Sequence, residues 1–115
     1  MSRAPETLPV IFRHETGSRH FHADVVAVFP TLPGTSDSAT VTVYAHTGQH
    51  STGSRGWYAK TRAATPAEYA PLLRELQGIY EQGEDAVTLK PASRWTRHHD
   101  DARRAELTRS RRAAA

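Results

Sequence analysis

Two histidines four residues apart are the part of this chain most suggestive of chemistry. His46 and His50 have the i, i+4 spacing of a metal-binding pair on a helix. Gly48 lies between them, however, and the surrounding residues are typical of a strand that runs into a loop. We therefore predict that the two side chains brace a hairpin by hydrogen bonds, without a bound metal or other cofactor. A histidine-dependent metal enzyme is the alternative.

The rest of the sequence lacks the common catalytic motifs. It contains no Gly-x-Ser-x-Gly elbow, no phosphate-binding loop and no dinucleotide fingerprint. The chain has no cysteine, which excludes disulfides, thiolate zinc sites and thiol nucleophiles. We therefore predict a protein that is not an enzyme and has no catalytic residues.

The hydrophobic pattern predicts the order β-β-β-β-α-β. The expected strands are residues 8–13, 24–29, 40–45, 57–62 and 86–90, with loops at 30–38 and 47–56. Pro9 places the first strand at an edge or starts it at Val10. The helix is expected from Thr65 to Tyr80, because Thr65 as N-cap and Glu68 three residues later form a capping box.

One helix cannot cover both faces of a five-stranded sheet. We therefore predict an α+β fold with an open, mostly antiparallel sheet, one helix packed on one face and the other face uncovered. Residues 1–91 would form this single domain. Residues 92–115 would be a basic tail, disordered or helical, since Ala102, Ala105 and Leu107 are too few and too small to anchor a helix.

The uncovered sheet face is the first candidate binding surface. Strand alternation would point Thr42, Tyr44 and His46 toward it, beside Thr88 and Lys90. Such a face suits a protein interface, the stacking of single-stranded nucleic acid, or plain solvation. Residues 1–90 hold 8 Lys/Arg and 9 Asp/Glu, a net charge of −1, so a protein partner is favoured. The expected contact residues are Tyr44, His46, Gln49, His50, Arg55, Trp57, Tyr58 and Lys60.

The basic tail is the second candidate surface. Residues 91–115 hold 7 Arg and 3 Asp/Glu, so their net charge of +4 accounts for the basic excess of the chain. Arginine binds phosphates and carboxylates bidentately, and Trp95 could anchor the tail on a partner. The tail contact residues are Arg94, Trp95 and Arg97. The alternative function is accordingly a nucleic-acid-binding accessory protein.

No targeting or membrane segment is apparent. The N-terminus has no apolar core of a signal peptide, and the longest apolar run, residues 25–29, is far too short to cross a bilayer. We therefore expect a cytoplasmic protein without a membrane partner.

Four segments together resemble a known family. They are Val10-Ile-Phe-Arg13, Val26-Ala-Val-Phe-Pro30, Tyr44-Ala-His-Thr-Gly-Gln-His50 and the stretch from Thr61 to Leu76. They resemble a family of small uncharacterised proteins carried by phages, plasmids and integrative elements, over about residues 10 to 80. The resemblance implies a genomic setting and no particular site residue. Small proteins of that setting often act on host machinery, including as inhibitors of defence systems such as CRISPR effectors.

Overall fold

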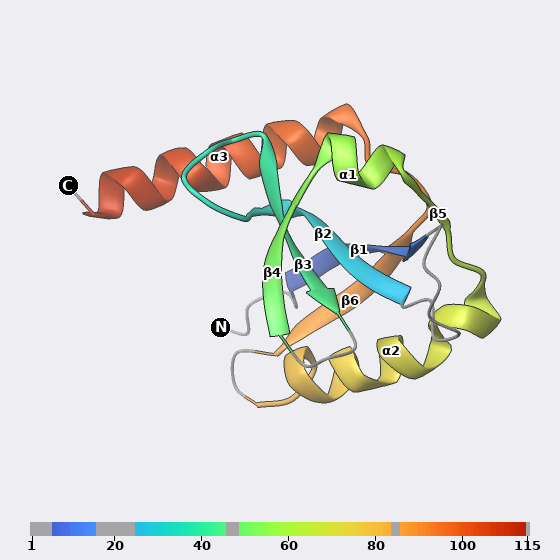
Figure 1. Ribbon diagram of the computed structural model, residues 1–115. Helices are drawn as coiled ribbons and strands as arrows, with labels where there is room; N and C mark the ends of the chain where they lie inside the picture. Colours follow the sequence, from blue (N-terminus) through green and yellow to red (C-terminus); the bar gives the residue numbers. More distant parts are fainter. Residues whose placement is uncertain (1–5, 16–24, 46–48, 84–85, 115) are drawn as a thin grey trace.

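The computed structural model describes residues 6–15, 25–45, 49–83 and 86–114. The α+β class is confirmed, with a curled sheet between helices (Figure 1). Along the chain the elements are β1 (Glu6–Glu15), β2 (Val25–Pro33), β3 (Thr40–Ala45), β4 (Gln49–Ser54), α1 (Arg55–Ala59), β5 (Thr61–Ala63), α2 (Pro66–Tyr80), β6 (Val87–Ala92) and α3 (Arg97–Ala114).

Within the described residues, the sheet is antiparallel except for one strand pair. Its order is β4-β3-β2-β1-β5, and β6 runs parallel to β1. β6 pairs with residues 6–11 of β1, and β5 pairs with residues 13–15 on the same side. Pro9 pairs with Lys90 inside β1, and β1 is an inner strand that pairs with β2, β5 and β6. The predictions of an edge strand and of a start at Val10 are therefore both wrong. β2 continues to Pro33 through a register shift after Phe29, so the predicted loop starts later than residue 30.

Helix α2 begins where its capping signal predicts. The Thr65 hydroxyl accepts a hydrogen bond from the Glu68 N–H, and the Glu68 carboxylate accepts one from the Thr65 N–H. The helix buries Leu72 and Leu76 against Phe29 and other residues of one sheet face. Gly83, with φ of 92°, follows its C-terminal end in the left-handed conformation that favours glycine.

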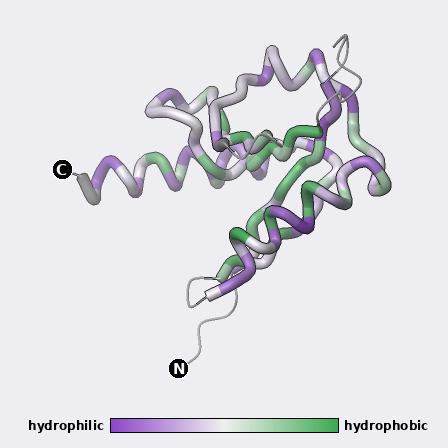
Figure 2. The backbone as a smooth tube through the Cα atoms, turned by 60° about the horizontal axis from the view of Figure 1, so that its bottom comes forward, coloured by the Kyte–Doolittle hydropathy of each residue, from purple (hydrophilic) through white to green (hydrophobic). Residues whose placement is uncertain are grey.

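The opposite sheet face is covered too, so the prediction of an uncovered face is wrong. Val28, Val41 and Val43 form a second core with Trp95, and Trp57 packs against it. α3 runs along this side of the sheet beside β2, while α2 lies on the other side (Figure 1). The hydrophobic stretches are concentrated in the strands, and α3 is mostly hydrophilic (Figure 2).

Residues 49–62 fold differently from the expectation. The predicted loop contains strand β4, and the predicted strand at 57–62 is replaced by the short helix α1 followed by β5. Ser54 causes the change, because its side chain accepts a hydrogen bond from the Trp57 N–H and caps the helix. Trp57 and Tyr58 thereby pack against the second core instead of alternating across a strand.

The described part of the predicted tail forms helix α3 from Arg97 to Ala114, and this helix packs on the sheet beside β2. Trp95 and Leu107 are 7% and 9% exposed, and Arg103 is 2% exposed. The prediction that residues 92–115 have too few buried side chains to anchor a helix is therefore wrong. A buried arginine supplies much of the anchoring that an apolar stripe would otherwise provide.

Candidate functional site

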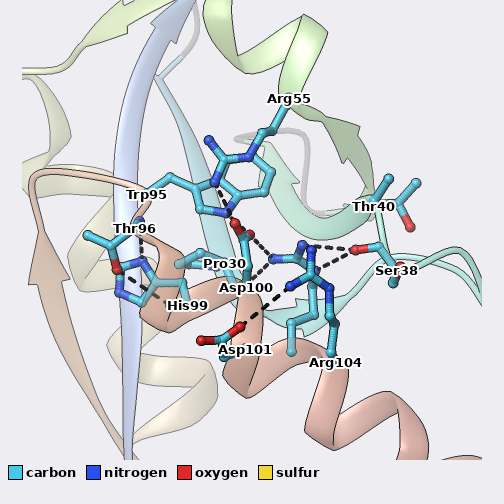
Figure 3. Close-up of polar contacts among 12 residues, drawn as sticks. Pro30, Ser38, Thr40, Arg55, Trp95, Thr96, His99, Asp100, Asp101 and Arg104 are labelled. Atoms are coloured by element: carbon cyan, nitrogen blue, oxygen red, sulfur yellow. Dashed lines mark hydrogen bonds and ion pairs between the residues drawn. The ribbon is translucent and has the colours of Figure 1, made fainter.

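An aromatic and charged cluster joins α1 to the start of α3. Its members are Arg55, Tyr58, Trp95, Asp100 and Arg103, which we call the Trp95 cluster. The indole N–H of Trp95 donates to Asp100 Oδ1 at 2.7 Å, and the Tyr58 ring meets Trp95 edge-on with centroids 5.2 Å apart. The Arg55 guanidinium lies over the indole, 4.4 Å from the ring centroid (Figure 3).

Asp100 is the central acceptor of this cluster. It accepts a hydrogen bond from Arg55 Nη2 at 2.8 Å, and Arg103 Nη1 lies 3.0 Å from its other oxygen. Partial burial alone would raise the pKa of Asp100, but hydrogen bonds from Trp95, Arg55 and Arg103 outweigh it and lower that pKa. The carboxylate is therefore ionised at neutral pH and offsets part of the charge of the two arginines.

Arg103 connects α3 to β2 and to the loop before β3. Its Nη1 donates to the Pro30 carbonyl at 2.7 Å, while Nε and Nη2 both donate to the Ser38 carbonyl, at 3.0 and 2.8 Å. Further along the helix, Arg111 Nη2 donates to the Ser36 carbonyl at 2.7 Å. These bonds fix the rotation of α3, so that the line of Asp100, Arg103 and Leu107 faces the sheet.

A charged hollow lies on one flank of this buried line. It encloses about 390 Å³ and is lined by three arginines, one aspartate and small residues: Ser38, Ala39, Ser54, Arg55, Gly56, Asp100, Arg103 and Arg104. The charge of its lining is 3 − 1 = +2. The hollow therefore suits an anionic group better than a neutral or cationic one.

A groove of mixed character lies on the other flank. It encloses about 440 Å³ between α3, β2 and the paired strands β1 and β6. Its lining residues are Glu6, Thr7, Leu8, Pro9, Thr31, Leu32, Tyr80, Val87, Ala102, Glu106 and Arg109. Glu106 and Arg109 form an ion pair at 2.9 Å on α3. The groove thus combines an apolar floor with charged residues.

Only part of the predicted contact set is brought together. Arg55, Tyr58 and Trp95 meet in the Trp95 cluster, and Trp57 packs on the core beside it. Arg94 and Arg97 are exposed, Arg94 between β6 and α3 and Arg97 as the first residue of α3. Lys60 is exposed, and its backbone N–H donates to the Trp57 carbonyl at the end of α1.

The remaining predicted residues lie on the α2 side or outside the described residues. Tyr44 is 4% exposed beneath α2, and burial, followed by hydrogen bonding to Glu75, raises the pKa of its phenol. The prediction that Tyr44 is exposed is therefore wrong. His50 hydrogen-bonds with Tyr80 Oη at 2.7 Å and so braces β4 against α2. Gln49 pairs with Ala45 in the sheet, and its side chain, like His46, lies outside the described residues.

Asp100, Arg103 and Arg104 are the site residues that the sequence reasoning missed. Asp100 and Arg103 have the i, i+3 spacing of a helical ion pair, which was the available signal. The burial of Arg103 has no local signal, because it depends on carbonyl groups about 65 and 73 residues earlier in the chain.

Two further searches cover the described part of the chain. In residues 6–15, 25–45, 49–83 and 86–114, no three histidine or carboxylate side chains are grouped so as to hold a metal ion. Among the helices of the same ranges, none has the length and apolar character needed to cross a membrane.

The fold and the site define a small α+β protein in which a basic helix is held against the sheet by side-chain hydrogen bonds. Comparison of the chain with protein-family models, with curated proteins and with solved structures gives no match. The resemblance to small proteins of mobile elements therefore stays a prediction.

Proposed function

We propose that the chain is a small cytoplasmic, non-enzymatic binding protein of a mobile genetic element that acts through a protein–protein surface. The genomic setting suggested by the resemblance makes inhibition of a host defence system, such as a CRISPR effector, the role to test first. The surface differs from the one expected from sequence, because the sheet face is covered and Tyr44 is buried.

The groove between α3 and the strands supports this proposal. Leu8, Pro9, Leu32 and Val87 give it an apolar floor, and charged residues of β1 and α3 surround that floor. An apolar centre inside a polar rim is the usual arrangement of protein interfaces. Its volume of about 440 Å³ accommodates one or two anchoring side chains of a partner.

A matched pair of substitutions on α3 tests the groove. Ala102 is exposed and lines the groove, whereas Ala105 is exposed on the same helix and does not line it. The partner is first identified by affinity capture from host lysate. We expect Ala102→Arg to fill the groove and to lower the affinity for this partner by at least about tenfold, the usual effect of losing one hot-spot contact. Ala105→Arg should leave the affinity within about twofold, since surface changes away from an interface have small effects.

Circular dichroism of both variants checks that the fold is kept. Undiminished capture by folded Ala102→Arg protein would contradict the groove as the binding surface. Equal loss in both variants would also contradict it, because it would place the partner on the outer face of α3.

A further inference from the structure

Three exposed arginines of α3 share one flank of the helix. Arg97, Arg104 and Arg111 follow one another at seven-residue spacing, which is close to two full helical turns. Each step is about 10.5 Å along the axis, so the three side chains cover about 21 Å. We call this set the arginine flank. It lies on the side of the charged hollow, because Arg104 lines the hollow and Arg111 donates to the Ser36 carbonyl of the adjoining loop.

The internal contacts of the arginine flank use few of its hydrogen-bond donors. A guanidinium carries five N–H donors. Arg104 makes one long contact of 3.5 Å with Asp101, and its side chain is 59% exposed. Arg111 donates from one nitrogen to Ser36. Arg103, by contrast, uses three nitrogens to brace the fold, so it is not counted as part of the flank.

Arg55 extends the flank across the hollow. It comes from α1, its side chain is 54% exposed, and its contact with Asp100 uses one terminal nitrogen. Ser38, Ala39, Ser54 and Gly56 are small, so they leave room for a bulky anion between Arg55 and Arg104. The flank and Arg55 carry four positive charges against Asp100 and Asp101, which gives 4 − 2 = +2.

We infer that the arginine flank, together with Arg55, binds the phosphodiester backbone of nucleic acid. This surface lies across α3 from the groove, so the inference does not rest on the proposed protein partner. A length of about 21 Å corresponds to roughly six base-pair steps of 3.4 Å. Guanidiniums spread over this length can each pair bidentately with a separate phosphate of the backbone. Contacts of this kind bind without sequence preference.

Fluorescence anisotropy tests the inference with a labelled duplex of about 20 base pairs and random sequence. With about three phosphates neutralised, the affinity should fall about 40-fold between about 50 and 200 mM salt, from a logarithmic slope of about −2.7. The variant Arg97→Gln/Arg104→Gln/Arg111→Gln should lose at least about tenfold in affinity at the lower salt and most of that slope.

A charge-matched control separates the site from net charge. Arg74, Lys90 and Arg109 are exposed and lie outside the flank, on α2, on β6 and on the groove side of α3. The triple change of these residues to glutamine removes the same three charges, and we expect it to keep most of the affinity and of the salt slope.

Several results would overturn the inference. The first is the absence of duplex binding at the lower salt, and the second is an equal loss of affinity in the two triple variants. The third is displacement of the duplex by polyglutamate at equal charge concentration, which would point to an acidic protein as the partner. If the flank variant loses its helical circular dichroism signal, the double variant Arg97→Gln/Arg104→Gln replaces it. That double variant keeps the bond of Arg111 to Ser36, and it should still lose at least about fivefold in affinity.

Discussion

The substitution Arg103→Met tests whether a buried guanidinium holds α3 on the sheet. Arg103 is 2% exposed and donates to the carbonyls of Pro30 and Ser38. Methionine keeps most of the apolar stem of the side chain and removes the donors. The expected effect is a lower free energy of unfolding.

The magnitude follows from the groups left without a partner. The bond to Pro30 is buried, and a buried acceptor that loses its donor costs about 1–3 kcal/mol. Ser38 lines the open hollow, so water can replace part of the hydrogen bonding that the Ser38 carbonyl loses with Arg103. Asp100 keeps Arg55 and Trp95 as partners. We expect a total loss of about 3 kcal/mol, out of a usual domain stability of about 5–15 kcal/mol.

Urea unfolding followed by tryptophan fluorescence measures this loss, because Trp95 lies beside Arg103 with the guanidinium carbon 5.4 Å from the ring centroid. Thermal unfolding should show a midpoint lower by about 12 °C, at roughly 4 °C per kcal/mol. Arg104→Met is the matched control, since Arg104 is exposed, and it should lose less than about 0.5 kcal/mol. Equal and small losses in both variants would refute the role given to Arg103.

Two further predictions concern the sheet and α2. Gly53→Ala should destabilise the fold by about 1–3 kcal/mol in urea unfolding, because the added Cβ would lie 2.9 Å from Val43 and 3.0 Å from Trp57. Gly78→Ala should instead stabilise α2 by about 0.5–1 kcal/mol, because no atom lies within 4 Å of the added Cβ. The opposite order of stabilities would contradict this packing. The hydrogen bond from the Arg62 guanidinium, with that from the Thr65 N–H, lowers the pKa of Glu68. The ionised Glu68 carboxylate therefore stabilises the folded state fully above the pKa of a glutamate in the unfolded chain, about 4.3, and this stabilisation is lost as pH falls below that value. The difference in urea midpoint between wild type and Glu68→Gln should stay constant from about pH 7 to 5 and shrink as pH falls below about 4.3, and a difference that stays constant down to about pH 3 would contradict the role of the charge.

Helix α2 and the inner strands could be predicted because their signals are local. The capping box of Thr65 and Glu68 and the alternation of strand β3 each depend on residues only a few positions apart. The alternation does not say which face is covered by which helix. Tyr44 was therefore placed on an exposed face, although it packs beneath α2.

Helix α1 was missed for a different reason. Trp57 and Tyr58 have high strand propensity, which favours the predicted strand, but the Ser54 hydroxyl three residues before Trp57 caps a helix. Tertiary packing reinforces the cap, since Trp57 and Tyr58 both contact the second core. The serine cap and this packing together outweigh the strand propensity of the two aromatic residues.

The anchoring of α3 was missed because the rule applied to it considers apolar residues alone. A helix held by a broad apolar stripe buries more than about 100° of its circumference. Here a narrow line of Asp100, Arg103 and Leu107 is enough to hold α3 on the sheet. Each polar contact of Arg103 ends on an oxygen in a fixed position, which belongs to strand β2, to the loop before β3 or to Asp100 of α3 itself. Anchoring by a narrow line leaves both flanks of α3 outside the core. The helix can therefore expose a groove on one side and the arginine flank on the other, which a broad apolar stripe would have buried.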